Sequence, residues 1–136
     1  MREIKFRGRR KNSTEWAYGA FLAIPRLCSY IYDVQPDGQA TRYLVNEDTV
    51  GQFTGLLDSN GQEIYEGDII RFAPPLRWED DERRVGVVVF KYYAFIVKYD
   101  DMSAGLFNLA ANEAPYTIIG NIHDSPELLG ADHERD

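Results

Sequence analysis

The sequence predicts an all-β protein in which a small barrel occupies the C-terminal half. Aromatic residues make up 13% of the 136 positions and hydrophobic residues 44%, while runs that favour helices are scarce. Residues 52–72 contain two apolar segments separated by turn-forming residues at 58–61, and a second turn is indicated at 66–68. Two turns this close make the chain fold back on itself, as the strands of a small barrel require.

Alternating apolar residues predict the strands of the N-terminal half. Residues 2–8 alternate, which places Ile4 and Phe6 on a core face and the charged side chains on a solvated face. The second strand ends at Pro25, because proline lacks an amide for the strand ladder. A polar break is expected at 46–48. The further strands predicted in this half are residues 16–24, 29–34 and 42–45.

Two apolar runs give the strongest strand predictions of the C-terminal half. Residues 85–90 and 94–100 are rich in Val, Ile and Phe, and residues 91–93 join them as a short hairpin connection. The densely charged segment 77–84 before them is expected to be an exposed loop. Their nearly continuous apolar character predicts burial on both faces, or one face in a core and the other against a partner.

The last quarter of the chain is predicted to be mostly irregular. Residues 101–115 are expected to form a loop with one weak strand near 106–109. The final strand is predicted at 116–122, where Gly120 marks a bulge or a point of close approach. Ser followed by Pro at 125 and 126 then indicates the start of a short helical turn.

Charge is distributed unevenly along the chain. The formal net charge is −7, and residues 1–11 hold six basic side chains and one acidic side chain. The other 125 residues therefore carry −12, which repels phosphate backbones and disfavours nucleic acid as a partner. Cys28 is the only cysteine. A single cysteine excludes an intramolecular disulfide and a Cys-based zinc cluster, and Cys28 is expected to be a small buried residue.

Neither secretion nor membrane insertion is predicted. The basic start is not followed by the apolar core of a signal peptide, and no run of about 18 apolar residues occurs. We therefore expect a cytoplasmic protein with no membrane partner. Gly55, Gly61 and Gly67 recur every six residues but lack the lysine and the strand-loop-helix setting of a phosphate loop. No cofactor is predicted.

The basic N-terminal strand has two interpretations. It is either a solvated strand face or a contact surface for nucleic acid, and several aromatic residues could stack on bases or pack in a core or protein interface. The basic residues are Arg2, Lys5, Arg7, Arg9, Arg10 and Lys11. The aromatic residues are Trp16, Tyr18, Tyr30, Tyr32, Tyr43 and Tyr99.

No catalytic set can be assembled from the remaining polar residues. Glu63, Glu66 and Asp68 could hold Mg²⁺ for phosphodiester hydrolysis if they converged, but Gly67 between the last two predicts a turn instead. His123 adjoins Asp124, so their side chains point to opposite faces of an extended chain, and His133 lies in the tail. No metal site is therefore predicted. We interpret the prominent residues of the central segment as turn-forming: Gly55, Asp58, Gly61, Glu66, Gly67 and Asp68.

Four separated segments together resemble a known family of phage proteins. They are REIKFRG at the start, QFTGLLDSNGQEIYEGDII in the centre, GVVVFKYYAFIVKY in the hairpin and YTIIGNIHDSPELL at the end. In this order they are similar to the blocks of the YopX family of phage and prophage proteins. The resemblance implies an all-β protein with an SH3-type barrel and offers no catalytic residue. Residues 9–52 depart most from the family blocks, so a partner-specific surface is expected there.

These observations define one expected organisation and three functional hypotheses. We expect a single domain with an N-terminal β module at 1–51, an SH3-like barrel at 52–130 and a tail at 131–136. The first hypothesis is a non-enzymatic phage accessory protein that binds a host or phage protein and forms a homo-oligomer. The second is nucleic-acid binding through the basic strand, and the third is a metal-dependent nuclease or hydrolase.

Overall fold

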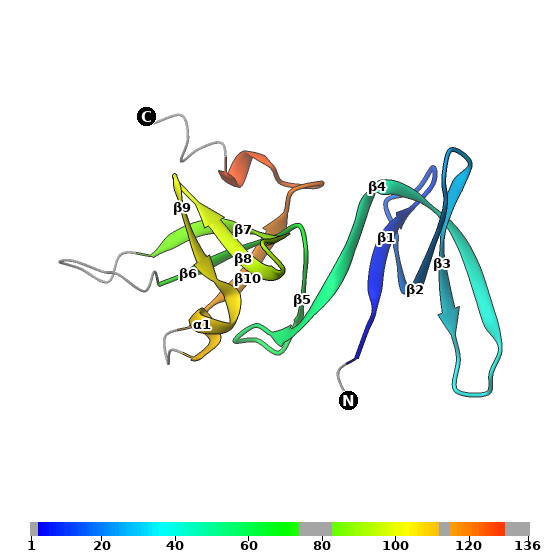
Figure 1. Cartoon of the computed structure of the whole chain (residues 1–136), viewed down its shortest axis with the longest axis horizontal. Helices are drawn as coiled ribbons and strands as arrows, with labels where there is room; N and C mark the ends of the chain where they lie inside the picture. The colour runs from blue at the N-terminus through cyan, green and yellow to red at the C-terminus, as the bar shows by residue number, and fades with distance from the viewer. Residues whose placement is uncertain (1–2, 74–82, 112–114, 130–136) are drawn as a thin grey trace. The chain divides into compact units, whose positions relative to one another are not determined.

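The chain folds almost entirely into β-strands. The computed structural model describes residues 3–73, 83–111 and 115–129 (Figure 1). Strands account for 61% of these residues and helices for 8%, which confirms the all-β prediction. The chain divides into two compact units, Met1–Gly55 and Leu56–Asp136, called unit 1 and unit 2 below. The boundary lies inside one long strand, four residues beyond the boundary expected from the sequence.

Unit 1 is built from four antiparallel strands. β1 pairs with both β2 and β4, β2 pairs with β3, and β3 pairs with β4. Each strand therefore has hydrogen-bonded neighbours on two sides. The strands are β1 (Phe6–Arg10), β2 (Trp16–Ile24), β3 (Cys28–Val34) and β4 (Ala40–Leu57).

β4 continues through the polar residues at 46–48, so the predicted break there is wrong. The ladder between β1 and β4 shifts register between Arg7 and Arg9. At this shift the Thr49 hydroxyl donates a hydrogen bond to the Asn46 carbonyl at 2.6 Å and accepts one from the Arg9 amide at 2.8 Å. The Thr49 side chain here replaces a backbone hydrogen-bond partner of the strand ladder. The strand therefore continues through these polar residues, although they lack the alternating apolar pattern of a strand.

The core of unit 1 is small. Ala17, Ile31 and Val45 are its buried residues, and partly buried side chains pack around them. Phe6 and Phe21 lie among these with ring centroids 5.7 Å apart. Ile4, which was expected on the core face, precedes β1 and is 70% exposed. The other partly buried residues around this core are Tyr43 and Val50.

Unit 2 contains a five-stranded antiparallel sheet and a larger core. Its strand order is β10-β6-β7-β8-β9, and β5 pairs with β4 outside this sheet. The strands are β5 (Glu63–Tyr65), β6 (Asp68–Phe72), β7 (Arg84–Lys91), β8 (Ala94–Tyr99), β9 (Met102–Gly105) and β10 (Thr117–Asn121). The core residues are Ile64, Ile70, Phe72, Val88, Phe95, Val97, Tyr99, Ala104, Leu106 and Leu109.

Two elements of unit 2 differ from the sequence predictions. Residues expected to be loop form β9, and the weak strand expected near 106–109 is wrong because the helix α1 (Leu106–Ala111) lies there. Leu106 and Leu109 are three residues apart, so a helix turns both onto one face, where they join the core. A strand would have placed these two leucines on opposite faces.

The hairpin and the last strand agree with the predictions. Residues 92 and 93 connect β7 to β8, with Lys91 opposite Ala94. The pairing of β10 with β6 shifts register between Ile118 and Gly120, which confirms a bulge at this glycine. Residues 127–129 are helical. Most of the charged segment at 77–84 lies outside the described residues, although Arg84 begins β7.

Candidate functional site

Strand pairing in unit 1 gathers apolar and aromatic side chains on one exposed face. Leu22, Tyr30 and Leu44 form a row across β2, β3 and β4. They alternate with core residues such as Ile31, so their side chains point away from the core. Leu22 is 46% and Leu44 41% exposed. We call this the outer face, made of Tyr18, Ala20, Leu22, Ile24, Tyr30, Tyr32, Arg42 and Leu44.

Unit 1 exposes more large apolar side chains than it buries. Among residues 3–55, seven large hydrophobic residues are exposed and four hydrophobic residues are buried. Single exposed apolar residues are ordinary on protein surfaces, whereas a contiguous group marks an interaction site. The exposed residues are Ile4, Tyr18, Leu22, Ile24, Leu27, Val34 and Leu44. Three of them, Tyr18, Leu22 and Ile24, are separated by even numbers of residues in β2, so they share one face.

Basic side chains of β1 lie on aromatic rings. The guanidinium groups of Arg7 and Arg9 are 4.5 and 4.4 Å from the centroid of the Trp16 ring. Arg7 is only 7% exposed, so the expectation of a fully solvated basic face is wrong. The register of β1 against β2 explains this burial. Arg9 lies opposite Trp16 and Arg7 lies opposite Tyr18, so both arginines share a sheet face with these rings. Stacked guanidinium groups of this kind contribute attraction between the cation and the ring quadrupole.

The other predicted basic residues occupy different places. Lys5 lies 5.2 Å from the centroid of the Phe53 ring, and Arg10 lies 4.7 Å from that of Tyr43. Lys11 lines a pocket, and Arg2 lies outside the described residues. The predicted basic strip is therefore divided among several aromatic partners.

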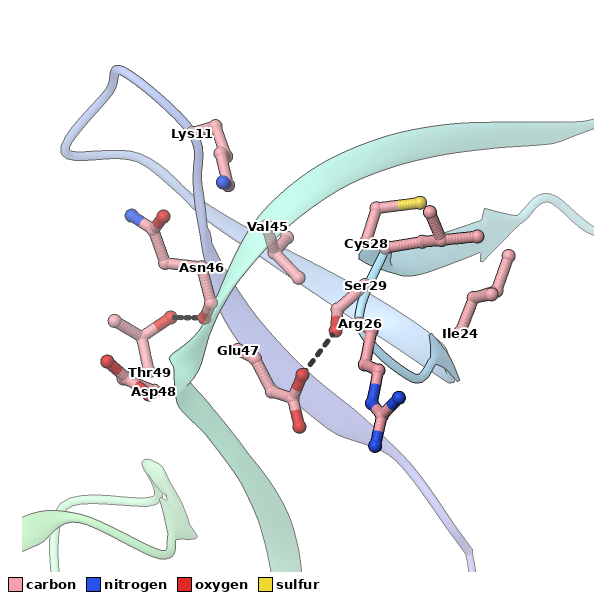
Figure 2. Close-up of a pocket in the computed structure, with 11 residues that line it drawn as sticks. Lys11, Ile24, Arg26, Cys28, Ser29, Val45, Asn46, Glu47, Asp48 and Thr49 are labelled. Carbon is pink, nitrogen blue, oxygen red and sulfur yellow. Dashed lines mark hydrogen bonds between the residues drawn. The ribbon is translucent and has the colours of Figure 1, made fainter.

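The described part of unit 1 also contains a pocket of about 460 Å³ near the hairpin between β2 and β3 (Figure 2). Val45, which is 1% exposed, and Ser29, which is 3% exposed, form its buried part. The Ser29 hydroxyl donates a hydrogen bond to the Glu47 carboxylate at 3.0 Å. Cys28 also lines the pocket and is half-buried, not buried as expected.

Both signs of charge surround this pocket. Lys11 and Arg26 supply cations, and Glu47 and Asp48 supply carboxylates. Arg26 has a positive φ of 66°, a backbone conformation that glycine or asparagine adopts more easily. Leu27, the next residue, is 78% exposed at the pocket rim. The pocket therefore offers apolar surface together with charged groups of opposite sign.

The central turn segment binds the last strand of unit 2. Asp58 is 5% exposed, and its carboxylate accepts three hydrogen bonds of 2.9 Å from the amides of Asn60, Gln62 and Ile118. Two of these bonds close the turn, and the third reaches β10. Tyr116, just before β10, donates its hydroxyl to the Leu57 carbonyl at 3.0 Å. Burial, together with the nearby Asp58 charge, raises the pKa of the Tyr116 hydroxyl.

Two of the three glycines of this segment lie in turns. Gly61 and Gly67 have positive φ values of 84° and 92°. Gly55 also has a positive φ, of 91°, but it lies inside β4, so the prediction that it forms a turn is wrong. The Gly67 amide donates a hydrogen bond to the Val88 carbonyl at 2.8 Å. The buried Asp68 carboxylate accepts a bond of 2.8 Å from the amide of residue 65.

The acidic residues of the metal hypothesis have partners within this turn. The Glu63 carboxylate accepts a hydrogen bond of 3.0 Å from the Tyr65 hydroxyl, and Glu66 is half-buried between β5 and β6. Among residues 3–73, 83–111 and 115–129, no group of three or more His, Cys, Asp or Glu is arranged to hold a metal ion. His123 is half-buried beside the β10 end, whereas His133 lies outside these ranges.

Several surface residues escaped the sequence analysis. Ile24, Arg26, Leu27, Glu47 and Asp48 were not singled out, because the pocket forms only when the β2–β3 hairpin meets β4. The sequence indicated only the region of this surface, because the outer face and the pocket both lie within residues 9–52, where a partner-specific surface was expected. No motif within this region identified individual residues.

The fold and the exposed surface define a small all-β protein of two units with a candidate protein-contact surface in unit 1. The YopX family model, described as YopX protein, matches residues 5–130, and the chain belongs to this family. No functionally curated protein matches the chain. No described helix is both long and apolar enough to cross a membrane.

A solved structure has a similar fold. It is the crystal structure of protein EF1440 from Enterococcus faecalis, with a TM-score of 0.58 and 23% sequence identity. The match covers 95% of this chain and 99% of that chain. At this identity the similarity applies to the fold alone.

Proposed function

We propose that this protein is a non-enzymatic accessory protein of a phage or prophage that acts in the bacterial cytoplasm through protein contacts, including contacts with its own copies. The outer face of unit 1 carries this proposal, because it exposes contiguous apolar side chains beside Trp16, Arg7 and Arg9. Trp, Tyr and Arg are the residues most enriched at the energetic centres of protein interfaces. Membership of the YopX family supports the phage assignment.

Self-association is tested by light scattering of the whole chain over a wide concentration range. The expected result is a mass that rises with concentration and falls back when a charge is placed on the outer face by Leu22→Asp. Leu57→Asp is the matched control, since Leu57 is 50% exposed but belongs to unit 2. A monomer at all concentrations, with no protein recovered on the immobilised chain from a lysogenic host, would contradict the proposal.

A second candidate function is binding of single-stranded nucleic acid on the same outer face. The observation in its favour is that Arg7, Arg9, Trp16 and Tyr18 lie together, since basic residues beside aromatic rings bind single strands. The net charge of −7 opposes it. Fluorescence anisotropy with a labelled oligonucleotide at low salt tests this function, and undetectable binding there excludes it. Detected binding must weaken with salt and in Arg9→Gln.

We further propose that the sheet of unit 2 is an SH3-type barrel. Its five antiparallel strands around one core and the tight turns at 58–61 and 66–68 support this assignment. In such a barrel, β9 and β10 would close the sheet. Slow hydrogen exchange of the amides in both terminal strands is the expected result, and fast exchange in either would contradict closure.

A further inference from the structure

The hairpin between β7 and β8 ends in two conspicuously exposed aromatic residues. Tyr92 is 79% and Tyr93 97% exposed. Both have positive φ, at 55° and 63°, in a two-residue connection between Lys91 and Ala94. Asn-Gly is the sequence that favours such a turn, because both positions need positive φ. Neither the turn geometry nor the core of unit 2 accounts for two tyrosines at these positions.

The residues around this turn form an aromatic projection. The Lys91 ammonium lies 5.5 Å from the centroid of the Tyr92 ring. Phe90 is 50% exposed, and its ring centroid lies 5.0 Å from that of Phe95, which anchors it to the core. We call Phe90, Lys91, Tyr92 and Tyr93 the aromatic tip. Tyrosine side chains have only two χ angles, so they lose little conformational entropy on binding and are frequent anchors of interfaces.

The pocket of unit 1 offers groups that match the aromatic tip. Ile24 and Leu27 provide apolar surface for the rings, and Arg26 provides a guanidinium group. Cations stack on aromatic rings repeatedly in unit 1, as Arg42 does at 4.5 Å from the centroid of Tyr30.

The acidic side of the pocket complements the polar atoms of the tip. The Glu47 and Asp48 carboxylates can accept hydrogen bonds from tyrosine hydroxyls and can pair with the Lys91 ammonium. The pocket volume of about 460 Å³ lies in the range of sites that enclose small ligands or side chains.

We propose that the aromatic tip of one copy binds in the unit 1 pocket of a second copy. This inference rests on the proposed self-association and names its contact. The two surfaces differ, so after a single contact one copy keeps an unused pocket and the other keeps an unused tip. Such a head-to-tail contact generates rings or open chains instead of closing at a two-fold dimer.

The test uses two variants that suit the local backbone. Tyr92→Asn with Tyr93→Gly removes the rings and leaves a sequence favoured at this turn, so folding is retained. The pair Arg26→Gly and Leu27→Ser removes two side chains that line the pocket. Glycine suits the positive φ of residue 26, and serine suits the exposed position of residue 27. Sedimentation of the full chain is expected to show self-association weakened at least about tenfold by either pair of substitutions. Met102→Ser, at an exposed residue of unit 2 outside the tip, is the control and leaves the association unchanged.

Mixing the two variants identifies the head-to-tail contact. Each variant retains the surface that the other lacks, so an equimolar mixture forms a one-to-one complex with wild-type affinity and no larger species. Absence of this complex overturns the inference, as does wild-type association in the tip variant. If Leu22→Asp abolishes association while the tip variant and the pocket variant both associate like the wild type, the inference fails and the proposed self-association stands. A wild-type chain that stays monomeric overturns both.

Discussion

Replacing Asp58 with asparagine is expected to destabilise unit 2. The carboxylate is 5% exposed and accepts three amide hydrogen bonds, each 2.9 Å long. Asparagine keeps one carbonyl oxygen, which can serve the amides of Asn60 and Gln62. Its NH₂ group then faces the Ile118 amide, so two donors meet where a donor and an acceptor met before.

The size of the effect follows from the bonds that change. A hydrogen bond to a charged group contributes about 1.5–3 kcal/mol, and a neutral one about 0.5–1.5 kcal/mol. In Asp58→Asn, one charged bond is lost outright and two become neutral. We therefore expect the free energy of unfolding to fall by about 3 kcal/mol, with water at the partly buried amides limiting the loss.

Urea denaturation measures this change through the midpoint of the transition at unchanged slope. Asp37→Asn is the matched control. The Asp37 carboxylate also accepts a bond within its turn, from the Gln39 amide at 3.0 Å, but this residue is exposed. The control is expected to lose less than about 1 kcal/mol. Equal effects of the two substitutions would refute the role assigned to the buried carboxylate.

Three further outcomes are expected. Gly19→Ala places a methyl group against the Tyr32 carbonyl oxygen at a φ of 151°, so the β2–β3 pairing must shift and urea denaturation should show a loss of about 1–3 kcal/mol; wild-type stability would contradict this contact. Trp16→Leu removes the ring beneath two guanidinium groups and is expected to cost unit 1 about 1–3 kcal/mol, whereas the same loss in Tyr18→Leu would show no special role for stacking. Because burial raises the pKa of the Tyr116 hydroxyl above the ordinary value of about 10, the unfolded chain ionises first. Stability is therefore complete below about pH 10 and falls as the pH rises further, and Tyr116→Phe should reduce that fall in a pH series of urea titrations.

The turns were predictable because their requirements are local. Gly61 and Gly67 adopt positive φ, and Asp58 binds amides only two and four residues away. The bond from the Ile118 amide to Asp58 could not be predicted in this way, since it joins residues 60 positions apart. Sequence reasoning therefore identified a turn but not its connection to the last strand.

The errors arose where a distant partner changed the meaning of a local pattern. Polar residues at 46–48 indicated a break, yet a bond between Thr49 and Arg9, 40 positions apart, continues the strand. Arg7 was assigned to solvent by its charge, and only the register with β2 places it against Trp16. The pocket likewise depends on the meeting of a hairpin and β4. Each case needs knowledge of strand register, which alternation alone does not supply.

The residues that mark the family and the residues proposed for binding serve different physical needs. Asp58 and Gly67 satisfy hydrogen bonds and backbone angles inside unit 2, where any replacement has a structural cost. Unit 1 instead buries few apolar side chains and exposes a row of them across β2, β3 and β4. A partner that covers this outer face would remove apolar surface from water and stabilise unit 1 in proportion to its occupancy. Binding and folding of unit 1 are therefore coupled, and a shift of its unfolding transition with protein concentration is the direct sign of the proposed self-association.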